Sequence, residues 1–170
     1  MYQLTKFSVV ILTGVALLCW AAPTLAGPTV PYKDHAQGIG LVTGVIDPGP
    51  PPILAIAIGG SGEGTRLGRY DFVGSHTLNF QTMTVDDGTF VQTAADGSAL
   101  SGTYSGTVKQ TGPNTRLLDL TVEIVEGTGR LAGVTGVNQT EVIVTGPFTT
   151  PTGKMYFTFT WTSDGTWTLP

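Results

Sequence analysis

The stretch of this sequence most suggestive of chemistry is GTGRLAGVTG, which places glycines at 127, 129, 133 and 136. Written as G-x-G-x-x-x-G, it is similar to the loops that hold a dinucleotide pyrophosphate. Such a loop needs a helix after it, because the N-terminal amides of that helix face the anion. The residues that follow, VTGVNQTEVIV, are instead typical of a strand. We therefore predict no nucleotide cofactor, and interpret Gly127, Gly129 and Gly133 as the positive-φ residues of a hairpin corner and bulge.

The remaining residue types that could support catalysis are sparse and poorly arranged for it. The only histidines are His35 and His76, which excludes a multi-histidine metal site, and the chain contains no DxDxDG calcium loop. No serine lies in a G-x-S-x-G elbow. The adjacent carboxylates Asp86 and Asp87 fall in a predicted hairpin turn, where they are expected to be solvated. These patterns predict neither a metal site nor a catalytic residue.

His76 is the strongest candidate for contact with a ligand, because it shares the apolar face of its predicted strand. Two interpretations stay open: a histidine satisfied by a neighbouring hydroxyl, and a polar group that orients a guest in an apolar cavity. Tyr104 is also expected to face inward, either to donate a hydrogen bond or to fill space. Arg116 could face inward or extend outward to water. The candidate ligand-binding residues are His76, Tyr70, Tyr104 and Arg116.

The elements that must position these residues are strands. In residues 69–80 the apolar positions alternate with polar ones, Val73 being the exception, and residues 154–162 show the same period of two. Asp-Gly steps in VDDGTF and AADGSAL predict hairpin turns. We count about eight strands and no convincing helical period. Because a long open sheet exposes sticky edges, we predict an all-β fold, an eight-stranded antiparallel barrel.

Two segments carry a resemblance to a known family. EGTGRLAGVTG resembles the glycine-rich turn of the allene oxide cyclase and dirigent-protein barrels, matching it at Gly127, Thr128, Gly129, Gly133 and Gly136. GTRLGRYDF is similar to a segment of secreted bacterial relatives of that superfamily. The resemblance implies an eight-stranded barrel with an apolar interior, often assembled as a homotrimer. It also implies the cyclisation or guided coupling of small apolar molecules.

The first residues have the order of a secretory signal peptide. Lys6 precedes an apolar run from Phe7 to Trp20, and small residues follow up to Ala26. We predict cleavage after Ala26, a secreted or periplasmic mature chain, and no membrane association after cleavage. Cys19, the only cysteine, would be lost with residues 1–26.

The mature chain is expected to contain a Pro/Gly-rich arm at 27–52 and a barrel domain at 53–170. Residues 38–46 could add a first strand to the arm, and 59–64, GGSGEG, are expected to form a loop. Loss of Lys6 leaves seven cations against twelve carboxylates with no basic stripe, which excludes binding to a nucleic-acid backbone.

Three functions stay open. The first is a secreted barrel that binds a small apolar ligand or serves as a structural module, without catalysis. The second is an isomerase or cyclase of the allene oxide cyclase type, or a dirigent-type coupling guide. The third is an extracellular protein-interaction module that acts through its threonine-rich outer faces or a trimer interface.

Overall fold

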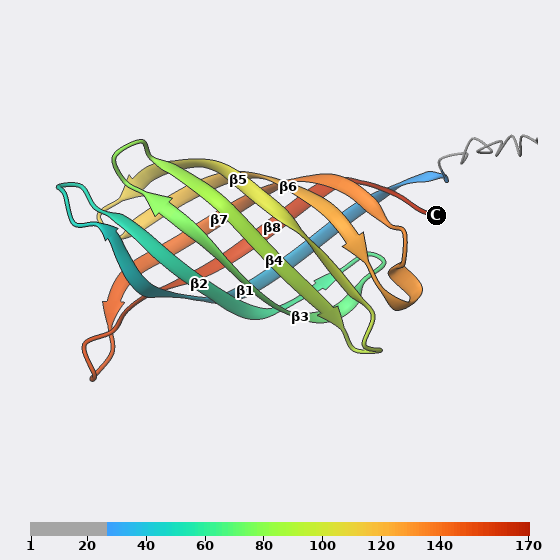
Figure 1. Cartoon of the computed structure of the whole chain (residues 1–170), viewed down its shortest axis with the longest axis horizontal. Helices are drawn as coiled ribbons and strands as arrows, with labels where there is room; N and C mark the ends of the chain where they lie inside the picture. Colours follow the sequence, from blue (N-terminus) through green and yellow to red (C-terminus); the bar gives the residue numbers. More distant parts are fainter. Residues whose placement is uncertain (1–26) are drawn as a thin grey trace, which may run out of the picture.

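The chain forms a closed barrel of eight antiparallel strands, and the computed structural model describes residues 27–170 (Figure 1). Each strand pairs with its neighbours in sequence, and β8 pairs with β1 to close the sheet. The predicted fold class is confirmed, while the predicted signal peptide lies outside the described residues. The strands are β1 (Thr29–Asp47), β2 (Ile53–Gly64), β3 (Gly68–Asn79), β4 (Thr84–Ala94), β5 (Ala99–Gly112), β6 (Thr115–Gly127), β7 (Thr135–Thr149) and β8 (Met155–Thr168).

The predicted alternation decides which side chains fill the barrel. In β3, Tyr70, Phe72 and Leu78 are buried, whereas Val73 is 63% exposed on the outer face. In β8, Phe157 and Phe159 are buried among the strands that surround them. Because successive side chains of a strand point to opposite faces, one closed sheet produces a single apolar interior and a solvated exterior.

The arm expected at 27–52 is mostly a strand: β1 begins at Thr29, well before the strand considered for 38–46, and pairs with both β2 and β8. Its period of two was hidden by a charged residue: Tyr32, Asp34 and Ala36 all face inward and are buried. An aspartate inside a barrel breaks the apolar pattern that a sequence can reveal. Only the partners described below explain why it is tolerated there.

The expected loop at 59–64 is also wrong, because these residues complete β2. Its inward glycines make room for aromatic rings. A Cβ at Gly62 would lie 2.5 Å from the Tyr70 hydroxyl oxygen, and one at Gly64 would lie 2.5 Å from that of Tyr32. The glycine-rich composition that suggested a loop is therefore a packing requirement of a strand.

One of the two predicted Asp-Gly turns is a bulge rather than a hairpin. Asp87 has a φ of 54° and lies within β4, where the pairing with β5 shifts register between Val85 and Gly88. The chain reverses earlier, between β3 and β4, where Met83 has a φ of 57°. An Asp-Gly step accommodates a bulge as readily as a turn, since both require unusual backbone angles. The second step, in AADGSAL, does form the turn between β4 and β5.

The glycine-rich stretch connects β6 to β7 through a 3-10 turn at Gly129–Leu131. Gly129 and Gly133 have φ angles of 61° and 79°, as expected. Gly127 does not have a positive φ; it is required because a Cβ there would lie 1.9 Å from the Leu131 carbonyl oxygen. The Thr128 hydroxyl accepts a hydrogen bond from the Ala99 amide at 3.1 Å, and Gly136 lies within β7. The stretch is a corner between strands.

The two ends of the barrel differ. At one end lie the β6–β7 connection, residue 27 and the C-terminus (Figure 1). The Tyr32 and Trp167 rings stack there with centroids 3.8 Å apart, and both residues are almost completely buried, as are Leu67, Leu100 and Val134. This end is filled by side chains. The turns that follow β1, β3, β5 and β7 surround the opposite end, which we call the mouth.

Candidate functional site

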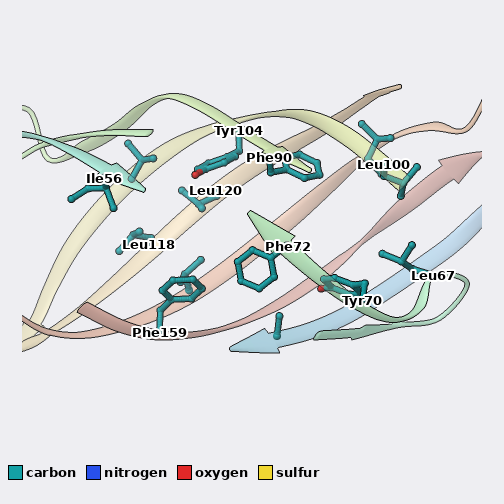
Figure 2. Close-up of a cluster of buried hydrophobic side chains, with 14 of the residues drawn as sticks. Ile56, Leu67, Tyr70, Phe72, Phe90, Leu100, Tyr104, Leu118, Leu120 and Phe159 are labelled. Atoms are coloured by element: carbon teal, nitrogen blue, oxygen red, sulfur yellow. The ribbon is translucent and has the colours of Figure 1, made fainter. Parts of the chain in front are cut away.

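The interior contains a cavity of about 100 Å³ with a mostly apolar wall. Its lining residues come from all eight strands and are dominated by aliphatic and aromatic side chains such as Ile56, Leu118, Val142, Phe157 and Phe159. Figure 2 shows four of the lining residues, Ile56 from β2, Tyr104 from β5, and Leu118 and Leu120 from β6. A wall of this kind favours an apolar guest.

His76 and Tyr104 form the polar pair of the cavity wall. The His76 Nδ1 atom lies 2.8 Å from the Tyr104 hydroxyl oxygen, and the two rings meet edge to face. Burial lowers the pKa of His76 to about 4 and raises the pKa of Tyr104. Both groups are therefore neutral at pH 7. His76 makes no hydrogen bond through Nε2 to the described residues, so this nitrogen is left to act as one donor or one acceptor.

Asp34 is the centre of a second polar group, deeper in the barrel, that the sequence did not predict. Its carboxylate accepts hydrogen bonds from the Tyr32 hydroxyl at 3.0 Å, the Tyr70 hydroxyl at 2.8 Å and the Trp161 indole at 3.2 Å. Asp34 is 7% exposed and forms no salt bridge with a cation among the described residues. Three neutral donors thus replace the water that this buried carboxylate has lost.

Tyr70 belongs to this Asp34 group and does not line the cavity, although the sequence analysis placed it among the ligand-binding candidates. Burial, reinforced by the adjacent Asp34 carboxylate, raises the pKa of both Tyr32 and Tyr70. Their hydroxyls therefore remain protonated as donors. Trp161 also packs on Phe72, with ring centroids 4.4 Å apart, which joins the polar group to the apolar wall.

Four further polar side chains line the cavity: Gln92, Asn138, Thr140 and Ser163. The Thr140 and Ser163 hydroxyls bond to each other at 2.7 Å. Asn138 is 5% exposed, and its Oδ1 atom has no partner in the described part of the chain. Strand parity could have found these residues, since Asn138 and Thr140 share the inward register of Val142. Asn138 also begins NQT (138–140), which matches the N-x-T glycosylation pattern, but its buried side chain is not presented as an acceptor in the folded chain.

Arg116 lies at the mouth and is half-buried. Its guanidinium donates to the Gly146 carbonyl at 3.0 Å, and its Cζ atom lies 5.0 Å from the centroid of the Phe80 ring. Phe80 follows β3, whereas Arg116 is on β6, so the two side chains meet across the mouth. Burial lowers the pKa of Arg116, but the group remains a cation at any ordinary pH.

The three cavity candidates that the structure brings together are therefore His76, Tyr104 and Arg116. Within residues 27–170, no cluster of three acidic, histidine or cysteine side chains is arranged to hold a metal ion. The same residues contain no helix with the length and apolar character needed to cross a membrane. The interior is a mostly apolar space that contains one buried carboxylate, that of Asp34, and has a cation, Arg116, at its entrance.

Comparisons with protein-family models, with curated proteins and with solved structures find no match to this chain. The resemblance of its glycine-rich turn to the allene oxide cyclase and dirigent barrels stays a prediction from the sequence.

Proposed function

We propose that the protein is a binding protein that holds a small apolar molecule inside its barrel. The observation that carries this proposal is the cavity of about 100 Å³, whose wall is apolar apart from a few polar groups, of which His76 and Tyr104 form a hydrogen-bonded pair. Dry apolar cavities of ~150 Å³ are large enough to bind benzene. A smaller cavity favours a short unbranched chain, whose hydroxyl or carbonyl could bond to the His76 imidazole.

The proposal assigns binding and no reaction. Asp34, the carboxylate that lines the cavity, already accepts three hydrogen bonds, and the His76 Nδ1 atom is bonded to the Tyr104 hydroxyl. A general base needs a lone pair directed at the proton that it removes. The arrangement therefore supports orientation of a guest better than proton transfer.

Titration with hexan-1-ol, an uncharged chain, tests this function by isothermal calorimetry and by amide chemical shifts. We expect saturable binding by the wild type and its loss in Val142→Phe, which would fill the cavity. Val142 is buried in the wall, whereas Val137 of the same strand is 47% exposed on the outer face. Val137→Phe is thus the matched control and should bind like the wild type. Absence of saturable binding by the wild type would contradict the proposal.

A second candidate function, self-association or docking through the outer face, is favoured by an apolar row on the barrel. Ile39, Gly59, Val73 and Val91 are paired in register across β1, β2, β3 and β4. Ile39, Val73 and Val91 are between 40% and 63% exposed. Exposed apolar rows mark interaction surfaces. A homotrimer through this row would appear in light scattering, and Val73→Lys should reduce it to a monomer.

We also propose that the protein is exported, on the sequence pattern of residues 1–26 alone. N-terminal sequencing of the protein from its own source is the test. We expect a mature chain that begins at Gly27, and an intact Met1 on a soluble species would contradict this.

A further inference from the structure

Two arginines of this barrel are used in opposite ways. The Arg130 guanidinium bonds to the Asp96 carboxylate at 2.6 Å, to the Arg66 carbonyl at 2.6 Å and to the Leu67 carbonyl at 2.7 Å. Its donors are used to fasten turns at the filled end of the barrel. The Arg116 guanidinium makes one hydrogen bond, to a carbonyl, and its buried Nε atom has no partner in the described part of the chain.

No acidic side chain among residues 27–170 forms a salt bridge with Arg116. A guanidinium carries five N–H donors, and a carboxylate is the group that matches its planar fork. Arg116 therefore presents an unneutralised positive charge, partly removed from water, at the entrance of an apolar space. Its contact with the Phe80 ring compensates for only part of that lost hydration.

Arg116 lines the cavity at the end of the barrel that we call the mouth. The opposite end is closed by the stacked rings of Tyr32 and Trp167 and by Leu67, Leu100 and Val134. Arg116 on β6 meets Phe80, the residue that follows β3, and these two strands are separated in the sheet by β4 and β5. A molecule in the cavity whose polar end points toward the mouth would place that end beside the guanidinium.

We propose that the ligand is an amphiphile with an anionic head group, a carboxylate, which Arg116 binds at the mouth while the apolar tail occupies the cavity. This inference rests on the proposed binding function and adds the chemical class of the ligand. An anion supplies the partner that the guanidinium lacks, and the tail meets the apolar wall of Leu118, Val142 and Phe157. The Phe80 ring then packs on the bound head group or moves aside.

Three ligands with the same six-carbon chain test this assignment: hexanoate, hexan-1-ol and hexylamine. By calorimetry at pH 7.5, we expect the wild type to bind hexanoate about tenfold more tightly than hexan-1-ol, the gain typical of a charge-assisted hydrogen bond. Hexylamine should bind most weakly. If hexan-1-ol binds and hexanoate binds no more tightly, the head-group assignment is wrong while the proposed function stands. If none of the three binds, the binding function itself fails.

Substitutions at Arg116 test whether this residue causes the preference for hexanoate. Arg116→Gln should lose the tenfold preference for hexanoate over hexan-1-ol, whereas Arg116→Lys should retain most of the preference. Lys109→Gln is the matched control for long-range charge, because Lys109 is an exposed cation that pairs in register with the neighbouring Leu117. It should leave the preference intact. If Lys109→Gln and Arg116→Gln lose the preference for hexanoate equally, the assignment is wrong. Amide spectra establish that each variant is folded.

Discussion

His76 and Asp34 are both polar side chains inside an apolar barrel, and they are accommodated by different means. His76 is kept neutral by burial and bonds to one hydroxyl, that of Tyr104. Asp34 is surrounded by three donors from β1, β3 and β8. The first arrangement leaves a nitrogen for a guest. In the second arrangement, the Asp34 carboxylate accepts hydrogen bonds that join β1, β3 and β8.

Burial of His76 makes the stability of the barrel depend on pH. Its folded-state pKa of about 4 lies below the unfolded value of ~6.5, so the unfolded chain binds the proton more readily. The stabilising contribution is complete above pH 6.5 and is lost as the pH falls toward 4, at about 1.4 kcal/mol per pH unit.

Urea denaturation at several pH values, for the wild type and for His76→Gln, measures this contribution as the difference between the two proteins. Carboxylates that titrate in the wild type and in the variant alike change the stability of both proteins equally, so their contribution cancels in the difference. If the His76 imidazole of the folded protein titrates by NMR with a pKa at or above ~6.5, His76 is solvated and this account is wrong.

The Asp34 group should be the most sensitive polar site of the interior. Asp34→Leu leaves the Tyr32 and Tyr70 hydroxyls and the Trp161 indole buried without an acceptor. We expect it to reduce the free energy of unfolding by about 3–5 kcal/mol. Tyr70→Phe, which removes one donor, should reduce it by only about 1 kcal/mol. Chemical denaturation compares the two, and similar losses would contradict this account.

At the scale of elements, the β6–β7 connection shows why a glycine-rich stretch need not bind phosphate. Gly129 has a φ of 61°, and a Cβ there would also lie 2.6 Å from the Ser98 hydroxyl oxygen. The geometry of the corner therefore requires a glycine at position 129. The element that comes after the corner is the strand β7. A helix would be needed to direct amides at an anion.

Gly129→Val should therefore destabilise the barrel by more than ~1 kcal/mol, because a β-branched residue resists a positive φ. Ala132→Val is the control in the same connection, where φ is −55°, and it should change stability by less than ~0.5 kcal/mol. Thermal denaturation monitored by circular dichroism measures both. An unchanged melting temperature for Gly129→Val, or binding of a dinucleotide by the wild type, would count against the corner interpretation.

At the scale of the whole molecule, β1 decides whether the barrel closes. It pairs with β2 on one side and with β8 on the other, and its residues 29–37 supply Tyr32 and Asp34 to the interior. A chain that begins at Gly38 should lose cooperative unfolding, because two strand edges and the partners of Asp34 would be left exposed. A chain that begins at Gly27 should unfold cooperatively. Survival of the shorter chain with its full β signal by circular dichroism would show that closure is dispensable.

The local sequence by itself determined the all-β class and the inward faces of the strands that alternate clearly, such as β3 and β8, because alternation with a period of two depends only on neighbouring residues. It placed Tyr70, Phe72, His76 and Leu78 on one face of β3, as the structure has them. It failed where tertiary contacts override the local pattern. Residues 59–64 looked like a loop because their glycines make room for the Tyr32 and Tyr70 rings, and Asp34 interrupted the apolar register of β1.

Only the tertiary structure decided which of these inward residues meet. Asp34 and Trp161 are hydrogen-bonded although 127 positions separate them in the chain, and Arg116 reaches Phe80 from the opposite wall. Such pairs depend on the register of every strand between them and on the closure of β1 against β8. The alternation within one strand contains no information about the registers of the other strands or about closure of the sheet. The cavity, its polar groups and the cation at its mouth therefore form only when the sheet is closed.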